Sequence, residues 1–169
     1  MKLTAQTEDP VALAKKAVDA GADMLVMIGR SPDFMPDIET HAPVLGSWGA
    51  IGGRWSLPAS LYWISKCWCE LPHTIAILGT NGARSADDVL RYLLSGARAV
   101  EFASLVLTKG AGVFTDMIAA LHSYGARKNL NSLSEVIGKA PDAAATYGSL
   151  SPIPHPSYPW DKFLKKAGD

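Results

Sequence analysis

Short, continuous apolar runs alternate along this chain with longer segments in which apolar residues recur every three or four positions. The runs at residues 24–28, 74–78 and 99–102 are typical of strands in a buried parallel sheet, and residues 2–5 predict a further short strand. Between these runs, helical spacing predicts five helices. They cover residues 10–20, 58–70, 86–94, 112–124 and 132–137. The pattern therefore indicates repeated β/α units.

Two of the predicted helices begin with clear capping signals. Asp9 followed by Pro10 is a helix start, because aspartate caps free amides and proline suits the first helical turn. Ser85 is a capping residue of the same kind, and Asp87 and Asp88 follow it in a first turn, where the helix dipole favours negative charge. These signals fix where the helices begin along the chain.

The fold class follows from the order of the elements. Four β/α units give an α/β fold, and periodicity alone allows either an open four-stranded sheet or part of a closed barrel. A complete (β/α)₈ barrel needs about 250 residues, whereas this chain has 169 residues. The chain is long enough for one core of domain size and for half of such a barrel.

One long segment, residues 29–57, shows neither the apolar runs of strands nor the helical spacing, and it is rich in Gly, Pro, Ser and Asp. Loops of this length inside compact domains are usually functional, so the segment is a candidate for part of a site. His41 lies within it and is a candidate acid or base on chemistry alone. The alternative for His41 is a solvated loop histidine.

The composition changes after residue 139. Proline recurs too often in residues 151–160 for a helix. Tyr158, Trp160 and Phe163 favour an extended tail that docks on another surface, and the alternative is a disordered tail. The chain thus divides into a β/α domain, residues 1–139, and a Pro-rich tail, residues 140–169, which is expected to act as an interface strap.

Composition and charge exclude several classes of function. The chain is 48% hydrophobic and 19% charged with a formal net charge of zero, which indicates neither a nucleic-acid-binding field nor an acidic tail. Its apolar runs are too short to span a membrane, and no signal peptide begins it, so the cytoplasm is the expected location. Cys67 and Cys69 have no further ligands near them, so they predict reduced structural thiols and no metal site.

The most informative motif joins the third main strand to its helix. The apolar run ends in the glycine-bearing turn 79–83, and about ten residues later a second strand ends in the small residues Ala103-Ser104. Two adjacent strand ends of this kind place backbone N–H groups where they would face a phosphate. Gly82 permits close backbone approach, and Ser104 adds a hydroxyl.

The order of these motifs resembles the carboxyl-terminal half of the FMN-dependent dihydroorotate dehydrogenase family, which includes the flavin domain of dihydropyrimidine dehydrogenase. The resemblance runs from about residue 2 to residue 139. Gly21-Ala22-Asp23 before a strand, the glycine loop 49–53 before Pro58, and the helix at 132–138 match successive pieces of that family. The resemblance implies a TIM-barrel type of fold, of which this chain holds the equivalents of strands five to eight.

The resemblance also implies FMN as the cofactor and assigns residues to it. Lys2 would reach the flavin ring near N1 and O2, and the family's Gly-Thr phosphate pair falls on Ala103-Ser104. The full set of implied cofactor-binding residues is Lys2, Gly52, Gly53, Gly79, Thr80, Asn81, Gly82, Ala83, Ala103 and Ser104.

The chain departs from the family where the substrate would bind. The family keeps a substrate-binding asparagine after its sixth strand, followed by Thr or Ser, and here Gly29 and Arg30 stand there. Arg30 would suit a carboxylate or phosphate of a substrate other than dihydroorotate, and its alternative is a surface arginine. Asn81 and Ala103 replace glycines of the family; asparagine tolerates left-handed backbone better than alanine does.

The family's catalytic base lies in the half that this chain does not contain. The sequence predicts no certain catalytic residue of its own. A half barrel also leaves two strand edges unpaired, which is a hazard for a free monomer. Three closures are open: a separate subunit in a hetero-oligomer, which we favour, a second copy of this chain, or a longer chain of which this is a fragment.

Three functions follow. The first is a subunit of an FMN-dependent oxidoreductase, in which a hydride passes between the flavin and a small substrate and the partner supplies the base. The second is a non-flavin barrel that uses the same turns for a phosphorylated metabolite. The third is a non-catalytic scaffold half.

Overall fold

The structure is a computed structural model, and it describes residues 1–150. The strands are β1 (Met24–Met27), β2 (Ser31–Asp33), β3 (Gly49–Ile51), β4 (Ala76–Gly79) and β5 (Ala99–Val100). The α-helices are α1 (Pro10–Asp19), α2 (Leu57–Glu70), α3 (Ala86–Leu94), α4 (Ser104–Lys109), α5 (Val113–Arg127) and α6 (Lys139–Asp142). Short 3₁₀ turns are η1 (Arg54–Ser56), η2 (Leu133–Val136) and η3 (Tyr147–Ser149).

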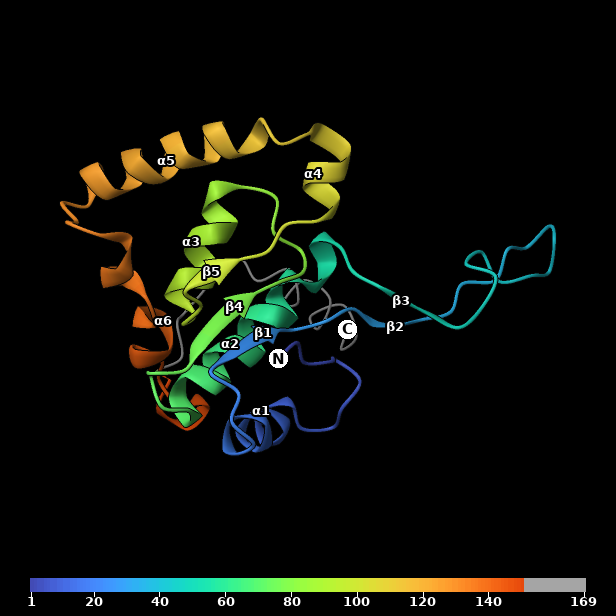
Figure 1. Cartoon of the computed structure of the whole chain (residues 1–169), viewed down its shortest axis with the longest axis horizontal. Helices are drawn as coiled ribbons and strands as arrows, with labels where there is room; N and C mark the ends of the chain where they lie inside the picture. The colour runs from blue at the N-terminus through green and yellow to red at the C-terminus, as the bar shows by residue number, and fades with distance from the viewer. Residues whose placement is uncertain (151–169) are drawn as a thin grey trace, which may run out of the picture.

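The centre of the molecule is a parallel sheet with the order β1-β4-β5 (Figure 1). The N-terminal segment extends it on the β1 side, where Lys2 forms an isolated parallel bridge with Val26 and the Leu3 amide donates to the Val26 carbonyl at 2.9 Å. The predicted strand over residues 2–5 is therefore wrong in length. The predicted α/β class is confirmed, and the spatial order of the parallel segments follows their order in the chain.

The two faces of this sheet are covered very differently. Leu25, Met27 and Ile77 point to the helices, are at most 3% exposed and pack with Ala14 of α1 and Ile64 of α2. Side chains on parallel strands alternate between faces, so the remaining positions of the strands lie on the opposite face. Within the part of the chain that the structure describes, the helices that contact the sheet cover only the first face.

The opposite face is more exposed, and the pairing register of the strands identifies its residues. Met24 pairs with Ala76, and Val26 pairs with Leu78, which in turn pairs with Ala99. Of these five side chains only Val26 is buried, and Met24 is 42% exposed. Parallel sheets are usually covered on both faces, so the exposure of this face is unusual for a parallel sheet.

The capping signals act as the sequence predicts. The Asp9 carboxylate accepts hydrogen bonds from the Val11 and Ala12 amides, and the Ser85 hydroxyl accepts one from the Asp88 amide. The helices predicted from periodicity are all present; the predicted ends of 86–94 agree with those of α3, and the other ends differ by at most three residues. The exception is the segment 132–137, whose turn η2 has 3₁₀ geometry. α4 was not predicted, because its six residues are too few to show a helical period.

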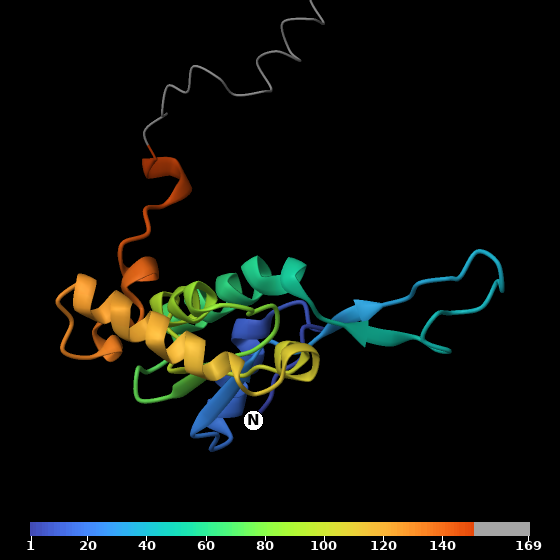
Figure 2. The same ribbon diagram turned by 90° about the horizontal axis from the view of Figure 1, so that it is seen from above.

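The segment predicted as irregular, residues 29–57, is partly ordered as a hairpin. β2 and β3 pair antiparallel, with Ser31 opposite Ile51, and the chain between them forms a long arm (Figure 2). Figure 2 shows this arm projecting beyond the end of the parallel sheet. The rings of Phe34 and Trp48 stack along it with centroids 5.7 Å apart, although the Trp48 side chain is 83% exposed. The pairing was missed because Ser-Pro-Asp and Gly-Ala-Ile carry no strand pattern.

The elements η2 and α6 lie against the helices α2 and α3. The indole Nε1 of Trp68 donates to Asp142 Oδ1 at 3.0 Å, which ties α6 to α2. The predicted boundary at residue 139 falls at the start of α6, and the predicted docking residues Tyr158, Trp160 and Phe163 lie outside the described residues. The division into two domains stays a prediction. Within residues 1–150, no helix has both the length and the apolar character needed to cross a membrane.

The two cysteines have no bonding partner and differ in exposure. Cys67 is fully buried and Cys69 is exposed. Burial raises the pKa of the Cys67 thiol to about 12, so it is a neutral core side chain at pH 7. Among residues 1–150, no group of three or more His, Cys, Asp or Glu side chains is arranged to hold a metal ion.

Candidate functional site

A pocket of about 730 Å³ lies at the carboxyl ends of the parallel strands. Its walls come from the segments that follow β1, β4 and β5, from the β2–β3 hairpin with the near ends of its arm, from the glycine pair after β3, and from Lys2 on the neighbouring N-terminal segment. In parallel α/β folds, ligands bind at this end of the sheet, because the loops after the strands converge there. The position of the pocket therefore marks it as the candidate site.

The turn after β4 forms the wall nearest to the start of α3. Asn81 and Gly82 both have left-handed backbone, with φ of 82° and 86°. Among the described residues, the amides of Asn81, Gly82 and Ala83 donate no hydrogen bond. Consecutive free amides in such a turn form a concave anion site. Asparagine adopts left-handed backbone more readily than most other non-glycine residues, so Asn81 and Gly82 can both hold this turn.

The turn after β5 forms the adjacent wall. Ala103 has φ of −121°, so the side chain causes no left-handed strain there, and α4 begins at Ser104. The ring of Phe102 meets that of Phe114 on α5 edge to face at 5.8 Å between centroids. Ala103 and Ser104 both line the pocket, as does Leu105 behind them.

The third wall is the glycine pair Gly52-Gly53, which follows β3. A Cβ built on Gly52 would lie 2.1 Å from the Asn81 carboxamide oxygen, and one built on Gly82 would lie 2.9 Å from the Gly53 carbonyl oxygen. Backbone atoms of this pair therefore approach the turn after β4 more closely than residues with side chains would allow. Each wall depends on the position of the other.

Tyr92 of α3 supports the turn from below. Its side chain is fully buried, and its hydroxyl lies within hydrogen-bond distance of the carbonyls of Thr80, at 2.8 Å, and Asn81. Burial raises the pKa of Tyr92 to about 12, so the hydroxyl keeps the proton that it donates. A Cβ on Gly79 would lie 2.2 Å from the Tyr92 ring, which explains glycine there by packing.

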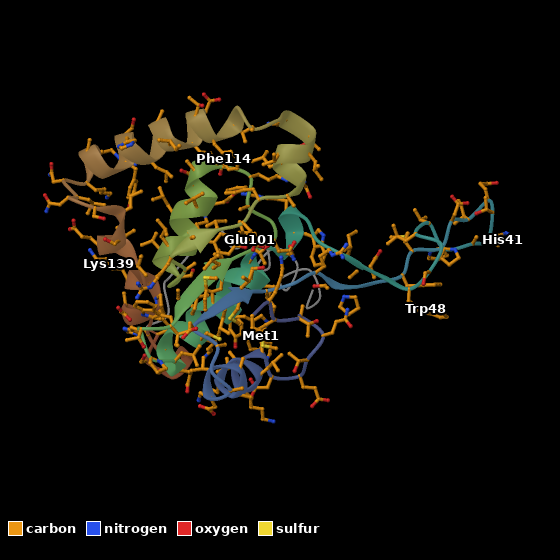
Figure 3. All side chains as sticks on the ribbon, viewed as in Figure 1. Met1, His41, Trp48, Glu101, Phe114 and Lys139 are labelled. Carbon is orange, nitrogen blue, oxygen red and sulfur yellow. The ribbon has the colours of Figure 1, made fainter. Side chains whose placement is uncertain are left out.

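Charged groups of both signs line the pocket. Lys2 Nζ and Glu101 Oε2 form an ion pair of 2.8 Å across it, with side chains 56% and 41% exposed. Glu101 directly follows β5 and lies near the centre of the molecule in Figure 3. Arg30, Arg84 and Asp33 also line the pocket, and the Arg30 and Arg84 side chains have no hydrogen-bond or ion-pair partner among residues 1–150.

A buried carboxylate lies behind these walls. Asp88 is 0% exposed, and its oxygens accept from the Arg84 amide at 2.9 Å, from Arg91 Nη1 at 2.9 Å and from Arg54. Burial on its own would raise the pKa of Asp88, but the Arg84 amide, the Arg54 guanidinium and the Ser85 hydroxyl outweigh it and hold the pKa below its usual value. Asp88 is therefore charged at neutral pH.

The structure brings most of the sequence-predicted site residues together. The pocket is lined by Lys2, Gly29, Arg30, Gly52, Gly53, Thr80, Asn81, Gly82, Ala83, Ala103 and Ser104. Gly79 lies within β4 against Tyr92 instead, and His41 lies on the far part of the arm, exposed and with φ of 56° (Figure 3). No described contact connects His41 to the pocket.

Sequence reasoning missed three residues that shape the site. The side of the sheet to which Glu101 points depends on strand register, which no local pattern reveals. Tyr92 falls among ordinary apolar positions of α3, and Asp88 has the sequence signature of a first-turn acid. The contacts that these two residues make with the site therefore cannot be predicted from the sequence. The capping pattern at Ser85 was the one available signal that placed Asp88 near the turn.

Comparisons with known proteins agree on one family. The sequence profile described as Dihydroorotate dehydrogenase matches residues 1–124. The catalytic subunit of dihydroorotate dehydrogenase B (NAD(+)) from Methanothermobacter thermautotrophicus is 32% identical over 83% of this chain and 46% of that protein. The corresponding subunit from Methanocaldococcus jannaschii is 30% identical over 82% of this chain and 45% of that protein.

A second type of relative gives the same result. Dihydroorotate dehydrogenase A (fumarate) from Lactobacillus helveticus is 34% identical over 72% of this chain and 37% of that protein. The chain thus spans less than half the length of each of these curated relatives. The matched part contains the parallel strands and every wall of the pocket.

Proposed function

Because the chain belongs to the dihydroorotate dehydrogenase family, whose members are FMN-dependent flavoproteins, we propose that it forms the phosphate-binding half of an FMN-dependent oxidoreductase. The observation that carries the proposal is the pair of turns after β4 and β5, which line one pocket, and in the turn after β4 three consecutive amides donate no hydrogen bond within the described residues. The missing part of the barrel would complete the site.

The residues of the pocket fit FMN. Three consecutive unpaired amides and the adjoining N-terminus of α3 suit a phosphate, and a pocket of about 730 Å³ is in the range of cofactor sites. Asn81, Gly82 and Ala83 would hold the phosphate from one side, and Ala103 and Ser104 from the other. Gly52 and Gly53 would leave room for the ring against their backbone. When bound, FMN would supply the hydride-transfer chemistry.

Lys2 is the residue suited to the ring. An ammonium near the pyrimidine part of a flavin stabilises negative charge there. In the structure the same ammonium lies 2.8 Å from Glu101 Oε2, so binding of the ring requires Lys2 to share or leave that ion pair. The pair is exposed enough for water to screen it, which keeps this rearrangement inexpensive.

Arg30 indicates an anionic substrate, and the catalytic base would come from the missing half. Gly29 and Arg30 stand at the end of β1 on the pocket wall, where an arginine would pair with a carboxylate or phosphate. His41 is the weak alternative for an acid or base within this chain, and its place on the arm separates it from the described pocket.

The partner is proposed from the uncovered side of the sheet. The face that bears Met24 and Ala99 would lie inside a complete barrel, and a second chain with the amino-terminal β/α units would cover it. A hetero-oligomer is favoured, and closure by a second copy of this chain is the alternative. Residues 1–139 would form the barrel half, and residues 140–169 would strap the interface.

The test is titration of the full 169-residue chain, alone and with its copurified partner, with FMN, followed by flavin fluorescence. We expect FMN to bind, and Arg84→Gln to weaken it roughly threefold to tenfold by removing a cation beside the phosphate turn. Arg127→Gln on α5 is the matched control and should leave the affinity unchanged. A complete complex that remains colourless and takes up no FMN would overturn the proposal.

The same titration separates the other two functions. Thermal stabilisation by phosphorylated metabolites without stabilisation by FMN would indicate a non-flavin phosphate site. Stabilisation by neither would indicate a scaffold half. The free amides of the turn favour a phosphate ligand over the scaffold, because unpaired amides in a pocket are suited to an anion.

A further inference from the structure

We infer that Asp88 is a positioning residue that fixes the glycine walls of the pocket against each other from behind, through Arg54 on one wall and the Arg84 amide on the other. Neither Asp88 nor Arg54 lines the pocket, so they would act on a ligand only through the walls. The inference goes beyond the proposed function and rests on it only in treating the pocket as a ligand site.

The first step is that one carboxylate joins two segments that are far apart in the chain. Asp88 Oδ2 accepts from the Arg84 amide, the residue that follows the turn after β4, and from Arg54, the residue that follows Gly53. Asp88 is 0% exposed, so water does not replace either contact. A buried carboxylate with several charged and backbone donors has one favourable arrangement, which makes it a rigid anchor.

The second step is that Arg54 belongs to a tight local turn and carries the glycine wall with it. Ser56 Oγ donates to the Gly53 carbonyl at 2.6 Å, and the Ser56 amide donates to the same carbonyl at 3.0 Å. η1 therefore moves together with Gly53. An Asp88–Arg54 contact that holds η1 also holds the pocket wall in front of it.

The third step is that the two glycine walls are in close contact. Gly82 lies against Gly53 and Leu57, and a Cβ added to Gly82 would be 2.8 Å from the Leu57 amide nitrogen. A shift of η1 would therefore move the turn whose free amides face the pocket. Asp88 would therefore affect a bound phosphate mainly by fixing the positions of the amides in this turn, more than through its own charge.

The structure offers a matched pair of variants for the test. Arg54 and Arg91 both donate to Asp88 and are 51% and 49% exposed, but Arg91 comes from α3 itself and touches neither glycine wall. Arg54→Gln would break the link between the walls, whereas Arg91→Gln would remove an equal charge from the same carboxylate. Hydrogen exchange is measured in the full chain without ligand at the Gly53 and Arg84 amides, one on each wall, which donate to Ser56 Oγ and to Asp88 Oδ2.

We expect Arg54→Gln to speed exchange at these amides roughly tenfold, as for loss of a charge-assisted hydrogen bond, and Arg91→Gln to leave them within twofold of the parent. Arg54→Lys should recover part of the protection. Equal effects of the two glutamine variants, or effects spread over the whole sheet, would show that Asp88 merely stabilises the fold and would overturn the inference.

A ligand readout completes the experiment and keeps the two proposals apart. With FMN as the probe, Arg54→Gln should raise the dissociation constant roughly tenfold, and Arg91→Gln should leave it near the parental value. If the parent takes up no FMN, the proposed function fails while the exchange comparison still decides the role of Asp88. If FMN binds equally to both variants, the walls are not held by Asp88 in the way inferred.

Discussion

The two faces of the parallel sheet differ in how completely other parts of the chain bury their side chains. One face is covered by helices, and its side chains Leu25, Met27 and Ile77 are closely packed. On this side of the sheet, the buried Asp88 of α3 is also fully hydrogen-bonded within the chain. On the other face Met24 is 42% exposed, and the ion pair of Lys2 with Glu101 is open to solvent. One face is a packed core, and the other is an open surface in the described part of the chain.

Under the proposed function, the open face is the side on which this chain would meet the rest of a barrel. A helix-covered face needs nothing more, whereas the open face carries both the apolar positions of a barrel interior and the charged groups of a pocket. The helix-covered side of the sheet thus stabilises the fold, and the open side carries the residues proposed for binding. Variants on the helix-covered face should change folding, and variants on the open face should change association and binding.

The largest expected effect comes from comparing neighbours in β4. Ile77→Ala removes a side chain that is 3% exposed on the helix-covered face and should lower the free energy of unfolding by about 2–5 kcal/mol. Leu78→Ala on the open face should cost no more than about half as much, because Leu78 is only partly buried. Urea denaturation of both variants measures the difference. Equal losses would mean that the open face is packed like a core in solution.

The next effect concerns the charge on the helix-covered side. Asp88→Asn should lower the free energy of unfolding by about 1.5–3 kcal/mol at pH 7, because hydrogen bonds to a charged group are lost. The folded pKa of Asp88 is depressed, so its contribution is present above the unfolded value of about 3.9 and is lost as pH falls through the folded pKa.

The difference between the parent and Asp88→Asn should therefore shrink as pH falls below about 4, because the parental carboxyl becomes protonated too. Asp37 and Glu70 also have lowered pKa values, but both are present in each protein and cancel in the comparison. Thermal unfolding between pH 2.5 and 7 measures this. A difference that stays constant over that range would contradict a charged Asp88.

The sequence predicts the helix-covered face better than the open face, for a physical reason. Burial between strands and helices leaves a local mark, so the runs at 24–28 and 74–78 and the caps at Asp9 and Ser85 are readable from the sequence. The boundaries shift by a few residues because hydrogen bonding between segments decides where a strand ends. The α/β class follows from these local marks alone.

What the sequence could not predict depends on contacts between distant segments. The β2–β3 hairpin joins residues 31 and 51 without a strand pattern, and the direction of Glu101 is set by the pairing of Gly79 with Val100. The residues that line the pocket could be named because turns after parallel strands converge. Their support by Tyr92 and Asp88 could not, since it arises only when α3 packs beneath the turn.

A smaller effect on folding, but a larger one on assembly, is expected at the edge of the open face. Met24→Gln should change the free energy of unfolding of the isolated chain by no more than about 0.5 kcal/mol, because the side chain is 42% exposed. The same change should weaken association with the proposed partner, because it places an amide in an apolar interface. Sedimentation velocity of the complex measures the loss. Lys16→Gln on α1 is a surface control, and equal behaviour of the two variants would argue against an interface at Met24.

The smallest effect on stability is expected where the open face meets the pocket. Glu101→Gln removes one partner of an exposed ion pair and should change the free energy of unfolding by less than about 0.5 kcal/mol. It frees Lys2, so binding of FMN should tighten about twofold to fivefold at low salt, and the gain should fade as salt screens the charges. Fluorescence titration at two ionic strengths measures it, with Glu39→Gln on the arm as a control. Weaker binding in Glu101→Gln would mean that the carboxylate holds Lys2 in place for the ligand, and the open face would then be as preorganised as the face that the helices cover.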